Sequence, residues 1–202
     1  MPNVLSVSRT YSGLARTVSD VCSPPALAIP GLLLCALVCD VAGVYRFALV
    51  YLIVAVLPPM FYVLWLLRTN QIDDFHLPNR QDRFRPFLAT LISAFAALSL
   101  LVLLGAPTFF LTCISALILQ ILVLFLITLF WQVSVHTATA AALVTFAVLA
   151  FDERAAALFL FLPFVGWARV YLERHTVTQC IAGVGVGCCC FPLLFAACGH
   201  IW

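Results

Sequence analysis

The stretch 108–131 reads TFFLTCISALILQILVLFLITLFW and contains no charged side chain. At about 1.5 Å per residue, a helix of this length is long enough to cross the roughly 30 Å hydrocarbon core of a bilayer. The rest of the chain is similar, because hydrophobic residues make up 65% of its 202 residues and its mean hydropathy is +1.16. Soluble domains contain about 45–50% apolar residues. The sequence therefore predicts a multi-span membrane protein and excludes a soluble domain.

Proline, glycine and charged residues divide the chain into apolar segments that predict an all-α polytopic membrane bundle. Seven spans are expected, at 24–43, 45–67, 84–105, 108–131, 135–151, 155–172 and 177–198. The fifth is short for a bilayer, so a count of six spans is the alternative. The LPP sequence at 57–59 lies inside the second span, where we expect a kink and no boundary, because bundled membrane helices tolerate proline.

The predicted domain organisation is simple. Residues 1–23 precede the first apolar run, and we expect them to form a cytoplasmic N-terminal tail, ordered or lying at the membrane interface. Residues 24–202 are expected to form a single transmembrane helical domain.

Arginine alone decides the predicted orientation, because the chain contains no lysine. On the seven-span count, only Arg46 and Arg154 lie on one side of the membrane. The N-terminal side carries the others: Arg9, Arg16, Arg68, Arg80, Arg83, Arg85, Arg169 and Arg174. The positive-inside rule therefore predicts a cytoplasmic N-terminus.

The nine cysteines lie mostly inside or beside the apolar spans. They form no CxxC pair and no Cys/His ligand spacing, so we interpret them as packing residues. The sequence contains no metal, haem or nucleotide motif, and we expect no cofactor, no metal and no nucleic-acid partner.

Three polar segments are expected on the cytoplasmic side of this arrangement. They read HLPNRQDRFRP at 76–86, WQVSVHT at 131–137 and WARVYLERHT at 167–176. Arginine offers a planar fork of donors that suits phosphate, and histidine can act as a nucleophile or proton carrier near pH 7. Ser134 is predicted to cap the helix that contains His136, and Thr176 or Thr178 to open the helix beside His175. Together these residues predict an anion site with two histidines.

The order of these residues resembles the membrane type-2 phosphatidic acid phosphatase family, whose motifs are K-x6-R-P, P-S-G-H and S-R-x5-H-x3-D. The resemblance covers about residues 76–187, and its third motif is the most specific. The corresponding residues here are Arg85-Pro86, Ser134 with His136, and Arg169 with His175. The resemblance implies that His175 attacks phosphorus, that His136 protonates the leaving alcohol, and that Arg85 and Arg169 hold the phosphoryl oxygens.

The chain departs from these motifs at five positions. Pro78 stands in place of the lysine, Val133 and Val135 in place of the proline and glycine, Ala168 in place of the serine, and Gln179 in place of the final aspartate. Arg80 or Arg83 would replace the lysine as a phosphate donor. Gln179 would lie on the same helical face as His175 and could accept a hydrogen bond from the imidazole N–H, but without a negative charge.

Two functional hypotheses follow from the sequence. The first is a metal-independent integral-membrane phosphatase that hydrolyses a lipid or prenyl phosphate through a phosphohistidine intermediate. The alternative is a catalytically degraded member of the same family that serves as a structural subunit of a larger membrane complex. Retention of both histidines favours the first, whereas loss of the aspartate and of the glycine favours the second. In both cases membrane lipids are the expected surroundings.

Overall fold

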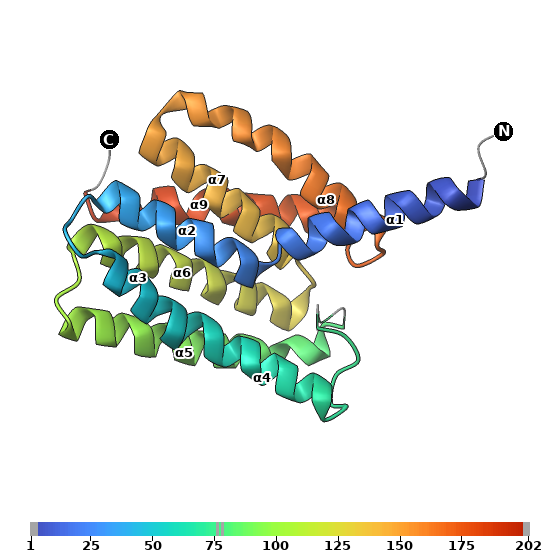
Figure 1. The fold of residues 1–202 in the computed structure, drawn as a ribbon, viewed down its shortest axis with the longest axis horizontal. Coiled ribbons are helices and arrows are strands. Elements are labelled where there is room, and N and C mark those ends of the chain that lie inside the picture. The colour runs from blue at the N-terminus through green and yellow to red at the C-terminus, as the bar shows by residue number, and fades with distance from the viewer. Residues whose placement is uncertain (1–3, 76, 78, 200–202) are drawn as a thin grey trace. The chain divides into compact units, whose positions relative to one another are not determined.

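The fold is described from a computed structural model, which covers residues 4–75, 77 and 79–199. Within these residues the structure contains helices and no strand, so the predicted all-α class is confirmed (Figure 1). His76 and Pro78 of the first polar segment lie outside the described residues, as do residues 1–3 of the predicted tail and residues 200–202 of the predicted membrane domain. The helices are α1 (Val4–Val21), α2 (Pro24–Cys39), α3 (Tyr45–Tyr51), α4 (Leu57–Arg68), α5 (Phe84–Leu103), α6 (Thr108–Phe130), α7 (Val135–Phe151), α8 (Leu162–Tyr171) and α9 (Val177–Ala197).

Three shorter segments complete this helical structure. A π-helical turn, η1 (Leu52–Val56), joins α3 to α4, and 3-10 segments η2 (Gln81–Arg83) and η3 (Glu153–Phe161) precede α5 and α8. Proline has no backbone N–H to donate to the preceding turn. The π-helical turn ends two residues before Pro58, and the helix continues through Pro58 and Pro59 as one segment, Tyr45–Arg68. No span boundary therefore falls at the prolines.

Within the described part of the chain, five helical segments are long and apolar enough to cross a membrane by length and composition. They are Tyr45–Arg68, Gln81–Leu103, Thr108–Phe130, Glu153–Tyr171 and Val177–Ala197. The pair Tyr11–Val21 and Pro24–Cys39, bent by 48°, would make a sixth. Val135–Phe151 is apolar but shorter, as the sequence predicted for the fifth span. The expected count of about seven is thus consistent with the structure, and the protein is an integral membrane protein.

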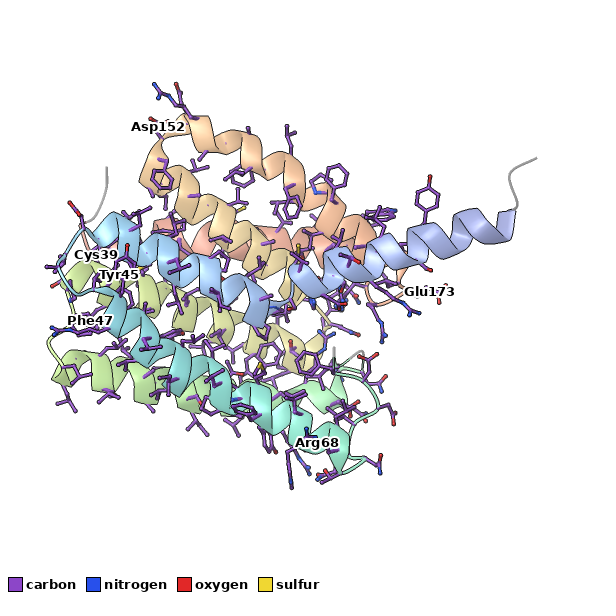
Figure 2. The ribbon with its side chains drawn as sticks, viewed as in Figure 1. Cys39, Tyr45, Phe47, Arg68, Asp152 and Glu173 are labelled. Carbon is purple, nitrogen blue, oxygen red and sulfur yellow. The ribbon has the colours of Figure 1, made fainter. Side chains whose placement is uncertain are left out.

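The chain divides into two compact units, which we describe separately. The first contains the chain up to Leu27 and the segment Val133–Cys188. In this unit α7, η3 and α8 form a hairpin, whose tip lies at Asp152 (Figure 2). The carboxylate of Asp152 caps η3 by accepting a hydrogen bond of 2.9 Å from the backbone N–H of Arg154.

The core of the first unit is built mainly from small side chains, which allow its helices to approach closely. Its buried residues are Cys22, Ala140, Ala141, Val144, Leu162 and Val165. The α9 helix packs against α7 through Gly183 and Gly187, where a Cβ atom would lie less than 3 Å from atoms of α7. The predicted N-terminal tail forms α1, which packs along α8 (Figure 1).

The second unit contains Ala28–Gln132 and the chain from Cys189 onward. Here α5 packs against α6 on one side and against the α3–α4 segment on another. Aromatic contacts support these helices; the rings of Phe47 and Phe110 are 6.4 Å apart. After Arg68, at the end of α4, the loop folds back so that Ile72 packs against Val63 and Leu66. This loop leads to the arginine-rich segment before α5.

Candidate active site

The turn between α8 and α9 sets the distance from Arg169 to His175. The backbone N–H of Glu173 donates to the carbonyl of Val170 at 2.9 Å, and that of Arg174 donates to the carbonyl of Arg169 at 3.0 Å. With Glu173 at a φ of 56°, these bonds form a Schellman motif, the common way to end a helix. The N–H of His175 also donates to the Arg169 carbonyl, at 3.2 Å. The backbone therefore fixes His175 directly above the last turn of α8.

The left-handed conformation of Glu173 makes a stability prediction, because only glycine adopts it without strain. The side chain is exposed (Figure 2), so substitution removes little packing. We expect Glu173→Gly to unfold at the same or a higher temperature than the native chain. Glu173→Val should destabilise by about 1–2 kcal/mol relative to Glu173→Gly, because a branched side chain is most strained at positive φ. Thermal unfolding in detergent measures this order, and a Val variant as stable as the Gly variant would contradict the turn geometry.

A capping box begins α9 and includes the side chain of Gln179. The Thr176 hydroxyl accepts from the backbone N–H of Gln179 at 3.3 Å, and Oε1 of Gln179 accepts from the backbone N–H of Thr176 at 3.1 Å. Such reciprocal bonds satisfy two donors that the first helical turn would leave open. The same Oε1 atom lies 2.9 Å from Nδ1 of His175. Because the Thr176 N–H can only donate, the atom facing His175 is the amide oxygen.

The start of α7 lies beside the start of α9. The Ser134 side chain accepts from the backbone N–H of Thr137 at 3.4 Å, which confirms Ser134 as the predicted N-cap. The backbone N–H of Ser134 donates to the carbonyl of Gln179 at 3.2 Å. The Thr137 hydroxyl donates to the carbonyl of Cys180 at 3.0 Å. These two bonds bring together the ends of two helices at which backbone N–H groups point outward.

Seven polar side chains are buried among the described residues of this unit, and four of them belong to the predicted site: Ser134, His136, Arg169 and His175. His136 lies in the first turn of α7, and Arg169 in the last turn of α8, where it is 1% exposed. Burying a cation away from water is costly unless hydrogen bonds compensate it. One such bond runs from Nη1 of Arg169 to Oγ of Ser19 in α1, at 2.6 Å.

The arginines of the first polar segment belong to the second unit. Arg83 is buried and donates from Nε to the carbonyl of Leu77 at 2.7 Å. Arg80 is exposed and donates to the carbonyl of Leu129 at 2.9 Å, and Arg85 is exposed and donates to Oε1 of Gln71 at 3.2 Å. Pro86 lies in the first turn of α5. The three arginines are thus neighbours in sequence with separate contacts, and Arg83 is the buried one.

Sequence analysis did not identify Ser19 as part of this region. The residue is 150 positions from Arg169 along the chain, and no motif includes it. Its only sequence signal is the helical spacing of Ala15, Ser19 and Cys22, which share one buried face.

Comparison with known proteins identifies the family. The sequence profile of the PAP2 superfamily matches residues 47–199, which is more than half of the chain and includes His136, Arg169, His175 and Gln179. The α1 helix lies before the matched region. No curated protein and no solved structure matches the chain. The motif resemblance and the profile agree, and the chain belongs to the PAP2 superfamily.

Proposed function

We propose that the protein is an integral-membrane phosphatase that hydrolyses a lipid or prenyl phosphate through a phosphohistidine intermediate. Membership of the PAP2 superfamily and the apolar helices support a phosphatase-like protein that meets its substrate at the membrane. The nucleophile in this proposal is His175, the general acid is His136, and Arg169 binds the phosphoryl oxygens.

The observation that carries the proposal is the contact between His175 and Gln179. Oε1 of Gln179 can only accept, so Nδ1 of His175 must carry the proton that it shares across 2.9 Å. In a neutral imidazole the lone pair is then on Nε2. The histidine is thereby held as the tautomer in which Nε2 is the nucleophile, which is the role that an orienting partner serves in other covalent catalysts.

The proposed reaction has two steps. In the first, the Nε2 lone pair forms a bond to phosphorus while the bond to the ester oxygen breaks, and protonated His136 gives its proton to the departing alkoxide. In the second, neutral His136 takes a proton from water, whose oxygen displaces Nε2 of His175 from phosphorus. The products are the alcohol and inorganic phosphate, and both histidines return to their starting states.

Charge stabilisation would come from the buried arginine and the adjoining helix ends. The guanidinium of Arg169 offers several N–H donors with the planar geometry that suits phosphoryl oxygens. Backbone N–H groups at the starts of α7 and α9 favour an anion in the same way. Ser134 would add a hydroxyl. We propose Arg80, Arg83 and Arg85 as further phosphate ligands on the basis of the first family motif.

The family and the membrane surroundings support the proposed substrate class. A phosphomonoester or pyrophosphate on an apolar chain is the form of phosphate that a membrane-embedded site would meet. The excess of arginine on the N-terminal side leads us to place the site at the cytoplasmic face.

The direct test is phosphate release by the purified protein in detergent, with a panel of phosphatidic acid, lysophosphatidic acid, prenyl phosphates and prenyl pyrophosphates. The proposal expects turnover of at least one of these substrates in the presence of a metal chelator. Folded protein that releases no phosphate from the whole panel would instead support the structural-subunit alternative.

Gln179 offers a change that should increase activity. Its amide orients His175 but supplies no negative charge to the imidazole during attack on phosphorus. Gln179→Asp should add that charge and raise kcat by about tenfold or more, which is well below the ~10⁴ seen when an amide also imposes the wrong tautomer. Steady-state kinetics on the best substrate of the panel measure the effect.

The matched control is Thr178→Asp. Thr178 is exposed and lies in the same first turn of α9, so this variant has the same net charge and a similar interaction with the helix dipole. If Thr178→Asp raised kcat as much as Gln179→Asp, the increase would come from added negative charge anywhere in this turn. The orienting role proposed for residue 179 would then be wrong.

A further inference from the structure

The α1 helix lies outside the part of the chain that matches the family, yet it contacts a central residue of the candidate site. Over the part of the helix whose burial is described, residues 11–21, the buried side chains are Ala15 and Ser19, and Cys22 follows after the helix ends; these three residues are 0–2% exposed. Val18 and Cys22 pack with the core that contains Leu162 and Val165 of α8. The helix is therefore held against α8 by apolar contacts on either side of Ser19.

A polar contact in this interface is the bond from Nη1 of Arg169 to Oγ of Ser19, at 2.6 Å. Both side chains are almost completely buried, with exposures of 1% for Arg169 and 2% for Ser19. Hydrogen bonds with one charged partner are short and stronger than neutral ones. The residue beside the arginine, Ala168, is also buried and has no polar side chain. The hydroxyl that holds the guanidinium thus comes from another helix.

The acceptor that Arg169 meets here is a hydroxyl group, and this matters for an anion site. A carboxylate at the same place would neutralise the guanidinium and compete with the phosphoryl group for its donors. A hydroxyl accepts one N–H bond and leaves the positive charge in place. It also restricts the long arginine side chain, which otherwise loses considerable rotamer freedom when it binds a ligand.

We propose that Ser19 is a positioning residue for Arg169, so that α1 forms a working part of the phosphate site. This inference rests on the proposed function for its catalytic consequence, but it also predicts an effect on simple anion binding. In this proposal the bond to Ser19 orients the guanidinium for binding to the phosphoryl oxygens.

The test compares three variants of the full-length protein in detergent. Ser19→Ala removes the acceptor, Ser19→Thr retains it, and Thr17→Ala removes an exposed hydroxyl from the same helix as a control. The readouts are kcat/KM on the best lipid phosphate and the Kd of orthovanadate, a mimic of the transferring phosphoryl group. Thermal unfolding is measured in parallel to identify variants that fail to fold.

We expect Ser19→Ala to lower kcat/KM and weaken orthovanadate binding by about tenfold each, the size typical of a lost hydrogen bond to a charged group. Ser19→Thr should retain most of the wild-type kcat/KM and of the wild-type orthovanadate affinity, and Thr17→Ala should change neither quantity. In an Arg169→Lys background, which lacks the planar fork, Ser19→Ala should have little further effect on orthovanadate binding. A purely structural role of Ser19 would instead give additive losses in that double variant.

The outcomes separate this inference from the proposed function. If the wild type hydrolyses lipid phosphates but Ser19→Ala matches it in both readouts, the positioning role is wrong and the phosphatase stands. If the wild type releases no phosphate, the proposed function is wrong, and the positioning role of Ser19 is then tested by the Kd of orthovanadate alone. Weaker binding by Ser19→Ala would then support the positioning role, whereas equal binding, or no binding by the wild type, would overturn it.

If Ser19→Ala fails to fold, Ser19→Thr is compared with Ser19→Cys, whose thiol is a weaker acceptor of similar size. Equal orthovanadate affinities of these two variants would overturn the proposal.

Discussion

Replacing His175 by alanine should abolish phosphate release, with a fall in kcat of about 10⁴-fold or more, because the proposed mechanism forms its covalent bond to phosphorus on this side chain. The backbone of residue 175 would keep its bond to the carbonyl of Arg169, so the turn should survive the substitution. Val177→Ala, a change to an exposed side chain two positions away, should leave kcat unchanged. Residual activity in His175→Ala within tenfold of the wild type would contradict the assignment of the nucleophile.

His136→Ala should show a different pattern, because a general acid matters most when the leaving group is strongly basic. We expect a loss of about 10²–10⁴-fold with alkyl phosphates and a much smaller loss in the first step with an aryl phosphate such as nitrophenyl phosphate. Burst kinetics with the aryl substrate separate the two steps. If the rate of the first step fell equally with alkyl and aryl phosphates, His136 would not be the group that protonates the leaving group.

The second large effect is expected at the contact between α9 and α7. A methyl group on Gly183 would lie 2.5 Å from the carbonyl oxygen of Ser134 and closer still to the hydroxyl of Thr137. A backbone atom cannot move aside without moving the helix, so Gly183→Ala should force α7 away from α9. Overpacking of this kind costs about 1–3 kcal/mol or more. Because Ser134 and His136 are at the displaced end of α7, activity should fall as well.

The chain contains its own control for this prediction. A methyl group on Gly185, two positions further along α9, would meet no atom within 4 Å. Gly185→Ala should therefore be neutral or stabilise by up to about 1 kcal/mol through helix propensity. In detergent, Gly183→Ala should unfold at a lower temperature than the wild type, and Gly185→Ala should unfold at the same or a slightly higher temperature. Equal stabilities would mean that α7 and α9 do not approach each other as closely as described.

The spans were predictable because they depend on local composition. Length and hydropathy are enough to define an apolar helix, and α6 and α7 fall within one residue of the expected boundaries. The cap at Ser134 was also predictable, since a serine directly before an apolar run has few other roles. The membership in the PAP2 superfamily followed from the order of arginines and histidines, and the profile match confirms it.

Other features depend on contacts that no local pattern encodes. The sequence offered Thr176 and Thr178 equally as the start of α9, and the capping box with Gln179 decides for Thr176. Among the arginines around the start of α5, the motif favoured Arg85, whereas the buried one is Arg83, because the preceding loop folds so that the Leu77 carbonyl faces its side chain. The bond between Ser19 and Arg169 joins residues 150 positions apart, and only the packing of α1 on α8 produces it.

The most direct test of the account is to trap the phosphorylated protein and locate the phosphoryl group. His136→Ala should accumulate it with an aryl phosphate, because the first step no longer needs the acid while the second still lacks its base. An alkaline quench preserves phosphohistidine, and peptide mass spectrometry with NMR of the isolated peptide identifies the modified nitrogen. We expect a phosphoryl group on Nε2 of His175, since in the proposed mechanism Gln179 holds the proton on Nδ1. A phosphoryl group on Nδ1 or on another residue, or phosphate release with no labelled protein at any time, would contradict it.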